Sequence, residues 1–163
     1  MTRVVALLAC LVLLLSGCAG KGAATSSADR LPATTLASFD SGPSLDLSKL
    51  RGPAVINVWA SWCGPCRTEL PRYQSFAQKY AGRVKVIGVD FQDPQMGRAR
   101  ELIRQTGVRF PLYKDPGGTI RARVLPQVLL VDAQGRVAYR KYVEITSLAQ
   151  LEKLVAQHLG TLS

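Results

Sequence analysis

The sequence has no long run of cations, and this absence limits the classes of partner. Its 163 residues include 21 Lys and Arg against 11 Asp and Glu, a formal net charge of +10. These cations are scattered along the chain, and aromatic residues are not interleaved among them. A nucleic-acid surface would concentrate basic residues on one stretch or face. We therefore interpret the charge as a solvated basic surface and expect no nucleic-acid partner, with a weak preference for anionic lipid or acidic proteins as the alternative.

The sequence also lacks an apolar stretch long enough to cross a membrane and remain there. The unbroken apolar run from Val4 to Leu15 has 12 residues, whereas a membrane-spanning helix needs about 20. Arg3 precedes this run, and the small residues Ser16 and Gly17 follow it. This order of charge, apolar run and small residues is typical of a signal peptide, which we place at residues 1–17.

The residues after the apolar run indicate an anchor and a tether. The stretch LLLSGC at 13–18 resembles the bacterial lipobox, whose cysteine is acylated and becomes the mature N-terminus. The resemblance implies that Cys18 is a lipid anchor holding the protein to the extracytoplasmic side of the cell membrane. The alternative is an ordinary signal peptide that ends near Ala19. Because residues 18–33 are rich in Gly, Ala, Ser and Thr, we expect a flexible tether there and a single domain at 34–163.

Few metal ligands remain after export. Cys10 leaves with the signal peptide and Cys18 is consumed by lipid, so Cys63 and Cys66 are the remaining thiols. A closed zinc site needs four ligands, and the sole histidine, His158, lies far away in the sequence. We expect no metal, and we expect His158 to be solvated or to cap a helix.

Strands and helices alternate along the rest of the chain. Apolar runs that favour strands occur at 54–60, 84–90, 110–113 and, as a pair joined by a turn, within 127–143, after a small hairpin between 36 and 47. Helical periodicity follows Cys66 as far as Gly82, then begins at Asp93 and Pro94 and ends at Gly107. A capping box of Ser147 and Gln150 predicts a last helix. This order predicts an α/β fold.

The two thiols come at the start of the first of these helices. Free backbone N–H groups and the helix dipole would stabilise a thiolate at Cys63, and Cys66 lies one turn on, on the same side of the helix. A bond between them closes too small a loop to stabilise the fold much, which argues against a structural staple. Pro65 is tolerated in a first turn, and Trp62 offers an apolar wall. We therefore interpret Cys63 as the nucleophile and Cys66 as the thiol that resolves the mixed disulfide.

Residues 55–71, VINVWASWCGPCRTELP, resemble the thioredoxin fold and, more narrowly, its exported TlpA/ResA/DsbE-like branch of thiol-disulfide oxidoreductases. The motif WCGPC after a buried strand carries the resemblance, with Glu69, Leu70 and Pro71 in support. The resemblance implies a central mixed sheet flanked by helices, an N-terminal hairpin, and an inserted strand and helix before the strand that follows Pro126.

The same resemblance implies further site residues. Pro126 would be a cis-proline that faces the thiol pair, and the backbone of Leu125 would pair with an extended substrate segment. Leu125 and Gln127 depart from the small or β-branched residues usual around this proline. Gly64 and Pro65 form the thioredoxin dipeptide, which points towards a reductant.

The proton acceptor for Cys66 is a second departure. Where thioredoxins have a buried Asp, this chain has Asn57, which cannot titrate. Asp93 is at about the place where the exported branch often has a Glu near the pair, so it is our candidate. The alternative for Asp93, an Asp before a Pro, is a helix N-cap.

We therefore expect an enzyme that exchanges electrons with cysteines of exported proteins through its own disulfide and needs no other cofactor. We expect a monomer that takes its electrons from a membrane donor and acts as a reductant, for example in cytochrome c maturation. The alternatives are an oxidant that takes the opposite direction and passes electrons to a membrane acceptor, a peroxide-reducing enzyme, and a binding module without catalysis.

Overall fold

The computed structural model describes residues 30–160. The predicted signal peptide, Cys18 and most of the predicted tether lie outside these residues. Arg30 forms an isolated β-bridge with Arg136, and Leu31 is buried in the core. The folded part therefore includes Leu31, which the sequence places in the tether, because this leucine buries its side chain against the sheet.

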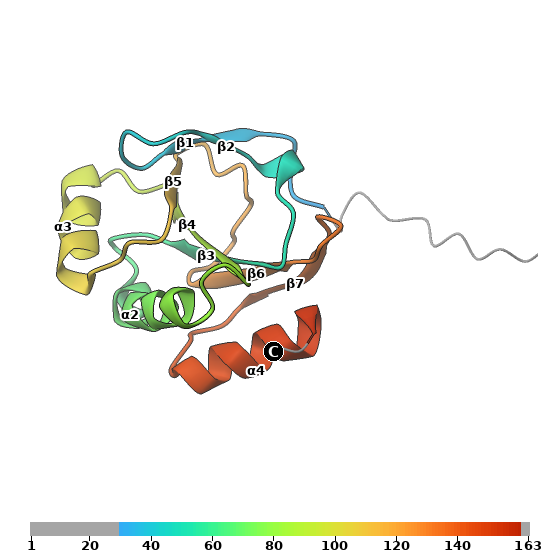
Figure 1. Ribbon diagram of the computed structural model, residues 1–163. Coiled ribbons are helices and arrows are strands. Elements are labelled where there is room, and N and C mark those ends of the chain that lie inside the picture. Colours follow the sequence, from blue (N-terminus) through green and yellow to red (C-terminus); the bar gives the residue numbers. More distant parts are fainter. Residues whose placement is uncertain (1–29, 161–163) are drawn as a thin grey trace, which may run out of the picture.

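Within the described residues, seven strands form one mixed sheet in the order β2-β1-β5-β4-β3-β6-β7 (Figure 1). The neighbours β3, β4 and β5 run parallel, and the other pairs are antiparallel. The predicted hairpin is β1–β2, which lies against β5, and the predicted insertion is the helix α3 followed by β5. The strands are β1 Thr35–Ser38, β2 Leu45–Asp46, β3 Ala54–Trp59, β4 Lys85–Phe91, β5 Leu112–Asp115, β6 Gln127–Val131 and β7 Val137–Tyr142.

One short 3-10 helix and two α-helices lie between the described strands, and a third α-helix follows the last strand. The helices are η2 Leu47–Lys49, α2 Gly64–Lys79, α3 Met96–Thr106 and α4 Leu148–Leu159. At α4, Ser147 accepts a hydrogen bond from the Gln150 N–H, as the capping box predicts, while the Gln150 side chain reaches the N–H of Thr146. In the part of the chain from 30 to 160, no helix combines the length and the apolar character that a bilayer span requires.

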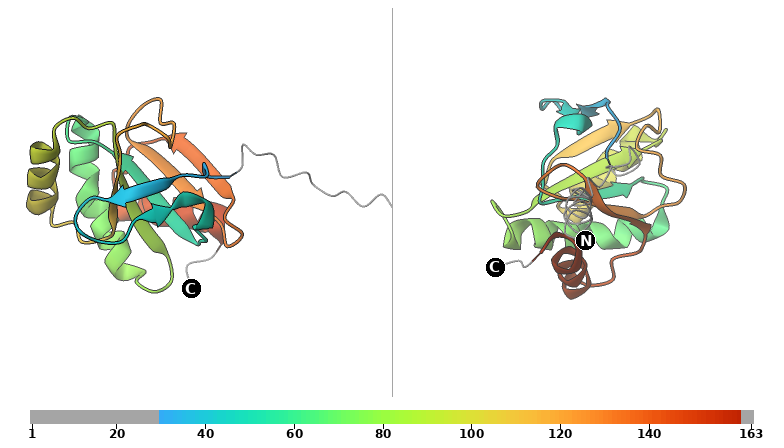
Figure 2. Two further views of the ribbon diagram at one scale, coloured as in Figure 1. Left: turned by 90° about the horizontal axis from the view of Figure 1, so that it is seen from above. Right: turned by 90° about the vertical axis from the view of Figure 1, so that its right-hand side faces the viewer.

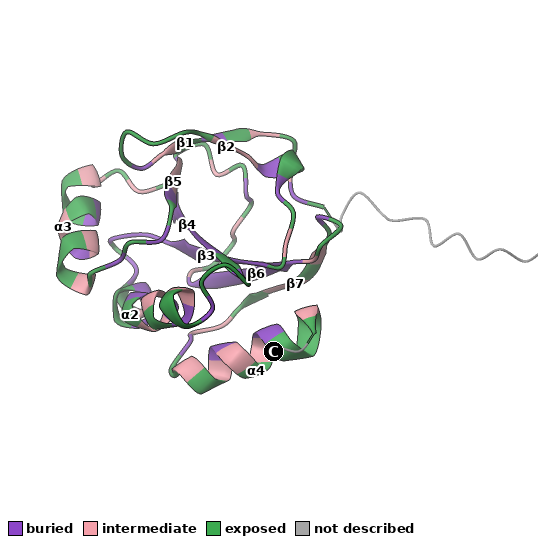
Figure 3. Cartoon of the chain, viewed as in Figure 1, coloured by how far each residue is buried: buried purple, intermediate pink, exposed green. Residues whose placement is uncertain are grey.

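The two faces of the sheet are covered differently (Figures 1 and 2). The buried side chains of α2, α3 and α4 pack against one face, around Trp59, Phe76 and Leu151. The other face packs against the hairpin, η2 and the segment around Ile120. The three α-helices therefore cover one face of the central strands, and the β1–β2 hairpin, η2 and the segment around Ile120 cover the other face. The central strands β3 and β6 are buried throughout (Figure 3).

The strand register brings three segments to one edge of the sheet. Trp59, the last residue of β3, pairs with Asp90 near the end of the parallel strand β4. Gln127, the first residue of β6, pairs with Val58 because β6 runs antiparallel to β3. The segments that follow β3 and β4 and the segment that precedes β6 therefore meet where α2 begins. The Leu125–Pro126 peptide bond in the last of these segments is cis, as the resemblance implies.

Candidate redox site

Cys63 and Cys66 form a disulfide at the start of α2, with Cα atoms 5.3 Å apart. Cys63 is the N-cap residue, and its sulfur accepts a hydrogen bond of 3.3 Å from the backbone N–H of Cys66. Cys63 is 5% exposed and Cys66 is fully buried. Of the two sulfurs, the one that a partner can reach is therefore also the one that the helix end stabilises as a thiolate.

The residues around the pair form its exposed rim. Trp62 is 51% exposed, unusually high for an aromatic side chain. Gly64 is exposed, and a Cβ placed on it would meet no atom within 4 Å, so the fold itself does not require glycine there. Pro65 lies in the first turn of α2, where the helix needs no N–H from it. Exposed residues therefore precede and follow Cys63 directly in the sequence.

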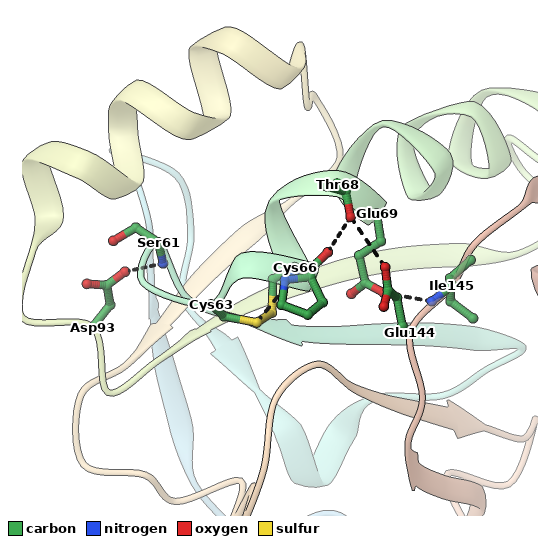
Figure 4. The surroundings of a disulfide bond; sticks show 9 residues. Ser61, Cys63, Cys66, Thr68, Glu69, Asp93, Glu144 and Ile145 are labelled. Carbon is green, nitrogen blue, oxygen red and sulfur yellow. Dashed lines mark hydrogen bonds between the residues drawn. A yellow bond between two sulfur atoms is a disulfide. The ribbon is translucent and has the colours of Figure 1, made fainter.

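Glu69 is a buried acid on the Cys66 side of the site, and sequence reasoning noted it only as part of a motif. It lies one helical turn after Cys66 and is fully buried. Its Oε2 accepts a hydrogen bond of 2.9 Å from the N–H of Ile145 (Figure 4), while its Oε1 has no partner among the described residues. Burial raises the pKa of Glu69 to about 8, against the opposing effect of the Ile145 N–H. The i, i+3 spacing from Cys66 was the sequence signal that could have identified it.

Asp93 lies on the other side of the disulfide, next to Ser61 (Figure 4). Its Oδ2 accepts a hydrogen bond of 2.5 Å from the Ser61 N–H, and its Oδ1 accepts one of 2.8 Å from the Gln95 N–H. The N-cap prediction for Asp93 is wrong, because α3 begins at Met96 with Gln95 as its N-cap residue. The carboxylate instead joins the loop after β4 to the loop that carries Trp62. The proton-acceptor role remains a prediction that this geometry does not favour.

Two more buried polar residues lie on the strands β3 and β4, which precede the site. Asp90 is 3% exposed, and burial, followed by the proximity of Asp93, raises its pKa to about 8. Asn57 is fully buried on β3, and neither atom of its amide has a hydrogen-bond partner within residues 30–160. As the sequence indicates, Asn57 supplies no titratable group, so the buried acids of this site come from α2 and β4.

The segment before β6 is held by polar contacts. Asp115 accepts hydrogen bonds from the N–H groups of Thr119 and Ile120, at 2.8 Å each. Arg140 donates to the Ile120 carbonyl at 2.8 Å and to Gln127 Oε1 at 3.4 Å. Gln127, the departure noted in the sequence, is thus a buried side chain that Arg140 contacts.

Residues 30–160 contain no group of three or more His, Cys, Asp or Glu that could hold a metal ion. His158 is exposed at the end of α4, and its ring lies 4.5 Å, centroid to centroid, from that of Tyr139.

Comparisons with known proteins find a matching family model and several similar proteins. The model of the AhpC/TSA family matches residues 28–140. The chain is 31% identical over 117 residues to thiol-disulfide oxidoreductase ResA of Bacillus cereus, covering 68% of this chain and 66% of the relative. It is 36% identical over 98 residues to a thiol:disulfide interchange protein DsbE homolog of Paracoccus denitrificans, covering 56% of this chain and 52% of the relative.

Among solved structures, the fold is similar to a putative thiol:disulfide interchange protein DsbE from Chlorobium tepidum. The TM-score is 0.69 at 28% identity, covering 83% of this chain and 96% of that one. The predicted thioredoxin-like α/β fold with a mixed sheet is confirmed by this likeness.

Proposed function

Because this chain belongs to the AhpC/TSA family, and because its two thiols form a disulfide at a helix N-terminus, we propose that it is a thiol-disulfide oxidoreductase of protein cysteines. The observation that carries the proposal is the Cys66 N–H directed at the Cys63 sulfur, which stabilises a thiolate there. The names of the ResA and DsbE relatives support the same activity. The chain spans 66% and 52% of the lengths of these two relatives.

The reduced protein would act in two exchanges. The Cys63 thiolate attacks one sulfur of a substrate disulfide, which forms a mixed disulfide and releases the other substrate sulfur as a thiolate that takes up a proton. The Cys66 thiol then loses its proton and attacks Cys63 Sγ, which releases the second substrate thiol. One enzyme dithiol thereby becomes the enzyme disulfide, and one substrate disulfide becomes two thiols.

Glu69 is the residue that we assign to the Cys66 proton. It follows Cys66 by one turn on the buried side of α2, and its Oε1 has no hydrogen-bond partner among residues 30–160. A carboxyl group with a pKa of about 8 matches the range of a cysteine thiol, which is the condition for efficient proton transfer between them. Replacing Glu69 by Gln should slow the second exchange more than the first.

Trapping of the mixed disulfide tests the mechanism. The variant Cys66→Ala retains the nucleophile and lacks the resolving thiol, so it should accumulate covalent adducts with cysteine-containing proteins. The matched variant Cys63→Ala should accumulate far fewer, because Cys66 is fully buried. Non-reducing gels before and after added reductant would show the adducts. Equal, negligible trapping by both variants would contradict the proposed function.

We further propose that the protein works as a reductant, on the basis of the dipeptide Gly64-Pro65. Thioredoxin, with about −270 mV, is the reference for a reductant, and an oxidant such as DsbA lies near −120 mV. Equilibration with glutathione buffers, followed by quantification of the reduced protein, gives the potential directly. A value near that of DsbA would favour the oxidant instead.

The compartment that we propose rests on the sequence. The predicted signal peptide at 1–17 and the lipobox-like cysteine support an extracytoplasmic protein anchored through Cys18, with exported proteins as substrates and a membrane protein as the electron donor. Maturation of c-type cytochromes, in which cysteines must be kept reduced, is one such pathway for a reductant.

A further inference from the structure

A groove lies beside the disulfide, between the start of α2 and the adjoining face of α3. It has a volume of about 420 Å³ and is lined in part by Trp62, Gly64, Arg67, Arg98 and Glu101. Trp62 and Gly64 are the immediate neighbours of Cys63 in the sequence. Any polypeptide whose sulfur reaches Cys63 therefore has this groove, which we call the α2–α3 groove, next to it.

The groove carries positive charge that the fold does not neutralise. Arg67 and Arg98 are both exposed, and neither belongs to any of the ion pairs within residues 30–160. The acid in the groove, Glu101, is paired with Arg104 and also accepts a hydrogen bond from Gln105. Two guanidinium groups thus remain available beside the reactive sulfur.

Acidic groups lie on the opposite side of the disulfide. Glu144 is 3.5 Å from the Thr68 hydroxyl, and the buried Glu69 lies on the same side (Figure 4). On the α3 side, Asp93 accepts backbone N–H groups with both oxygens. The charged side chains around Cys63 are therefore unevenly placed, with Arg67 and Arg98 towards α3 and Glu144 on the other side, which would favour one orientation of a charged partner.

The uncharged part of the groove offers an apolar surface and open space that a polypeptide could occupy. Trp62 is 51% exposed and offers a large apolar surface of the kind that anchors protein interfaces. Because a Cβ at Gly64 would meet no atom within 4 Å, the fold gains no packing from a glycine there, and the space that it leaves open adjoins the sulfur. A partner backbone can approach closely at this point.

We propose that the α2–α3 groove binds an acidic stretch of the substrate polypeptide, with Asp or Glu side chains within a few residues of the cysteine that exchanges with Cys63. This proposal rests on the thiol-disulfide exchange function and names its substrate class. Arg67 and Arg98 determine the specificity by pairing with the substrate carboxylates, and Trp62 contacts the adjoining backbone and side chains.

Kinetics with three peptides test the proposal. Each peptide carries one cysteine as a methyl disulfide, flanked by Glu, Gln or Lys residues. The reduced protein converts each into a free peptide thiol and methanethiol while forming its own disulfide. At low ionic strength we expect the Glu peptide to react about three- to tenfold faster than the Gln peptide, and the Lys peptide to react more slowly, because exposed ion pairs contribute modestly. Raising the salt concentration should reduce these differences.

Charge-reversed variants locate the preference. The double variant R67E/R98E should reverse the order and favour the Lys peptide, whereas R98K should keep the order of the wild-type protein. The matched control is R100E, on the same helix with the same change of charge, because the Arg100 guanidinium lies 6.0 Å from the Phe39 ring and lines a different pocket. R100E should leave the order and the ratios nearly unchanged.

A small neutral disulfide, bis(2-hydroxyethyl) disulfide, separates the possible failures. The wild-type protein and R67E/R98E should reduce it at similar rates. If the double variant loses this reaction as much as the reaction with the Glu peptide, the arginines act on Cys63 and the groove proposal is wrong. Equal rates for the three peptides also overturn it while leaving the exchange function intact. A wild-type protein that reduces neither the small disulfide nor any peptide overturns both.

Discussion

At the residue scale, Asp93 and Glu69, two of the acids near the disulfide, differ in how many backbone N–H groups their carboxyl oxygens accept. Asp93 accepts N–H groups from Ser61 and Gln95, one on each oxygen. Glu69 accepts one N–H, from Ile145, and is fully buried. A carboxylate with two backbone hydrogen bonds holds a loop in place, whereas a buried carboxyl with an open oxygen is able to exchange a proton. This difference is why the geometry favours Glu69 as the proton acceptor.

The burial of Glu69 predicts a pH-dependent stability. Its pKa is raised from 4.5 to about 8 by burial, so the folded state favours the neutral acid. Below about pH 4.5 the Glu69 carboxyl is neutral in both the folded and the unfolded protein, so it does not lower the stability. Above this pH the unfolded protein ionises more readily than the folded protein, so the stability of the wild-type protein falls relative to that of a neutral variant as the pH rises through about 8. We expect Glu69→Gln to be more stable than the wild-type protein at pH 9, by on the order of 2 kcal/mol, and to differ little at pH 4. Urea unfolding of the oxidised proteins measures this.

The control for this experiment is Glu101→Gln, which removes an acid that is paired with Arg104 on the surface. Its effect on stability should be small and nearly independent of pH over the same range. A Glu69→Gln variant with no pH-dependent difference from the wild-type protein would show that the carboxyl is not held neutral by the fold.

A second residue-scale prediction concerns Asp93. Asp93→Asn keeps one oxygen acceptor and loses the charge, so it should weaken the contact between the Trp62 loop and the start of α3 and lower the stability by about 1–2 kcal/mol. The rate of the second exchange should change much less than in Glu69→Gln. Rapid-quench measurements of the mixed disulfide provide this comparison, and a larger kinetic effect at Asp93 than at Glu69 would restore Asp93 as the acceptor.

At the scale of the elements, the close approach of β4 to its neighbours depends on Gly88. A Cβ at this position would overlap Leu112 Cδ2 and lie 3.1 Å from Phe110 Cε2 and 3.2 Å from Trp59 Nε1. Gly88→Ala should therefore lower the free energy of unfolding by about 1–3 kcal/mol. Gly97→Ala is the matched control, because Gly97 lies exposed in α3 with open space around it, and alanine there should stabilise the helix by up to about 1 kcal/mol. Denaturant unfolding compares the two variants, and equal stabilities would contradict the packing argument.

The main strands and helices could be predicted from the sequence because their patterns are local. The run AVINVWA becomes β3, and the capping box at Ser147 begins α4. The start of α3 could not be predicted, because the Asp93 side chain forms a contact with Ser61, 32 residues earlier in the chain, instead of capping the nearest helix. Local preference for an N-cap carries no information about such a distant partner.

In the candidate site, too, some features could be predicted from local sequence patterns and others depend on contacts between distant residues. Cys63 and Cys66 could be identified from their spacing and from the strand before them. The raised pKa of Glu69 depends on its burial in the folded protein, and its backbone hydrogen bond comes from Ile145, 76 positions away. The positive α2–α3 groove likewise depends on α3 packing beside α2, which no local pattern specifies.

At the scale of the whole molecule, the lipid anchor is a prediction from the first 18 residues. Cys18→Ser should move most of the protein from the membrane fraction to the soluble extracytoplasmic fraction, because we assign the attachment to the bilayer to the lipid on Cys18. Cys10→Ser, in the segment predicted to be removed, should leave it in the membrane fraction. Fractionation with immunoblotting measures both. Retention of Cys18→Ser in membranes after a high-salt wash would contradict lipidation.

The two edge strands of the sheet determine how readily neighbouring molecules could pair through their backbones. β2 has only two residues, and β7 carries Arg140 and Lys141 along its length. The edge strand β2 is so short that it offers few unpaired backbone groups to a neighbouring molecule. The cations on the other edge strand, β7, repel the same strand of a second molecule. Two copies that meet edge to edge should therefore separate again rather than pair their edge strands, so these two edges disfavour the growth of one sheet across neighbouring molecules.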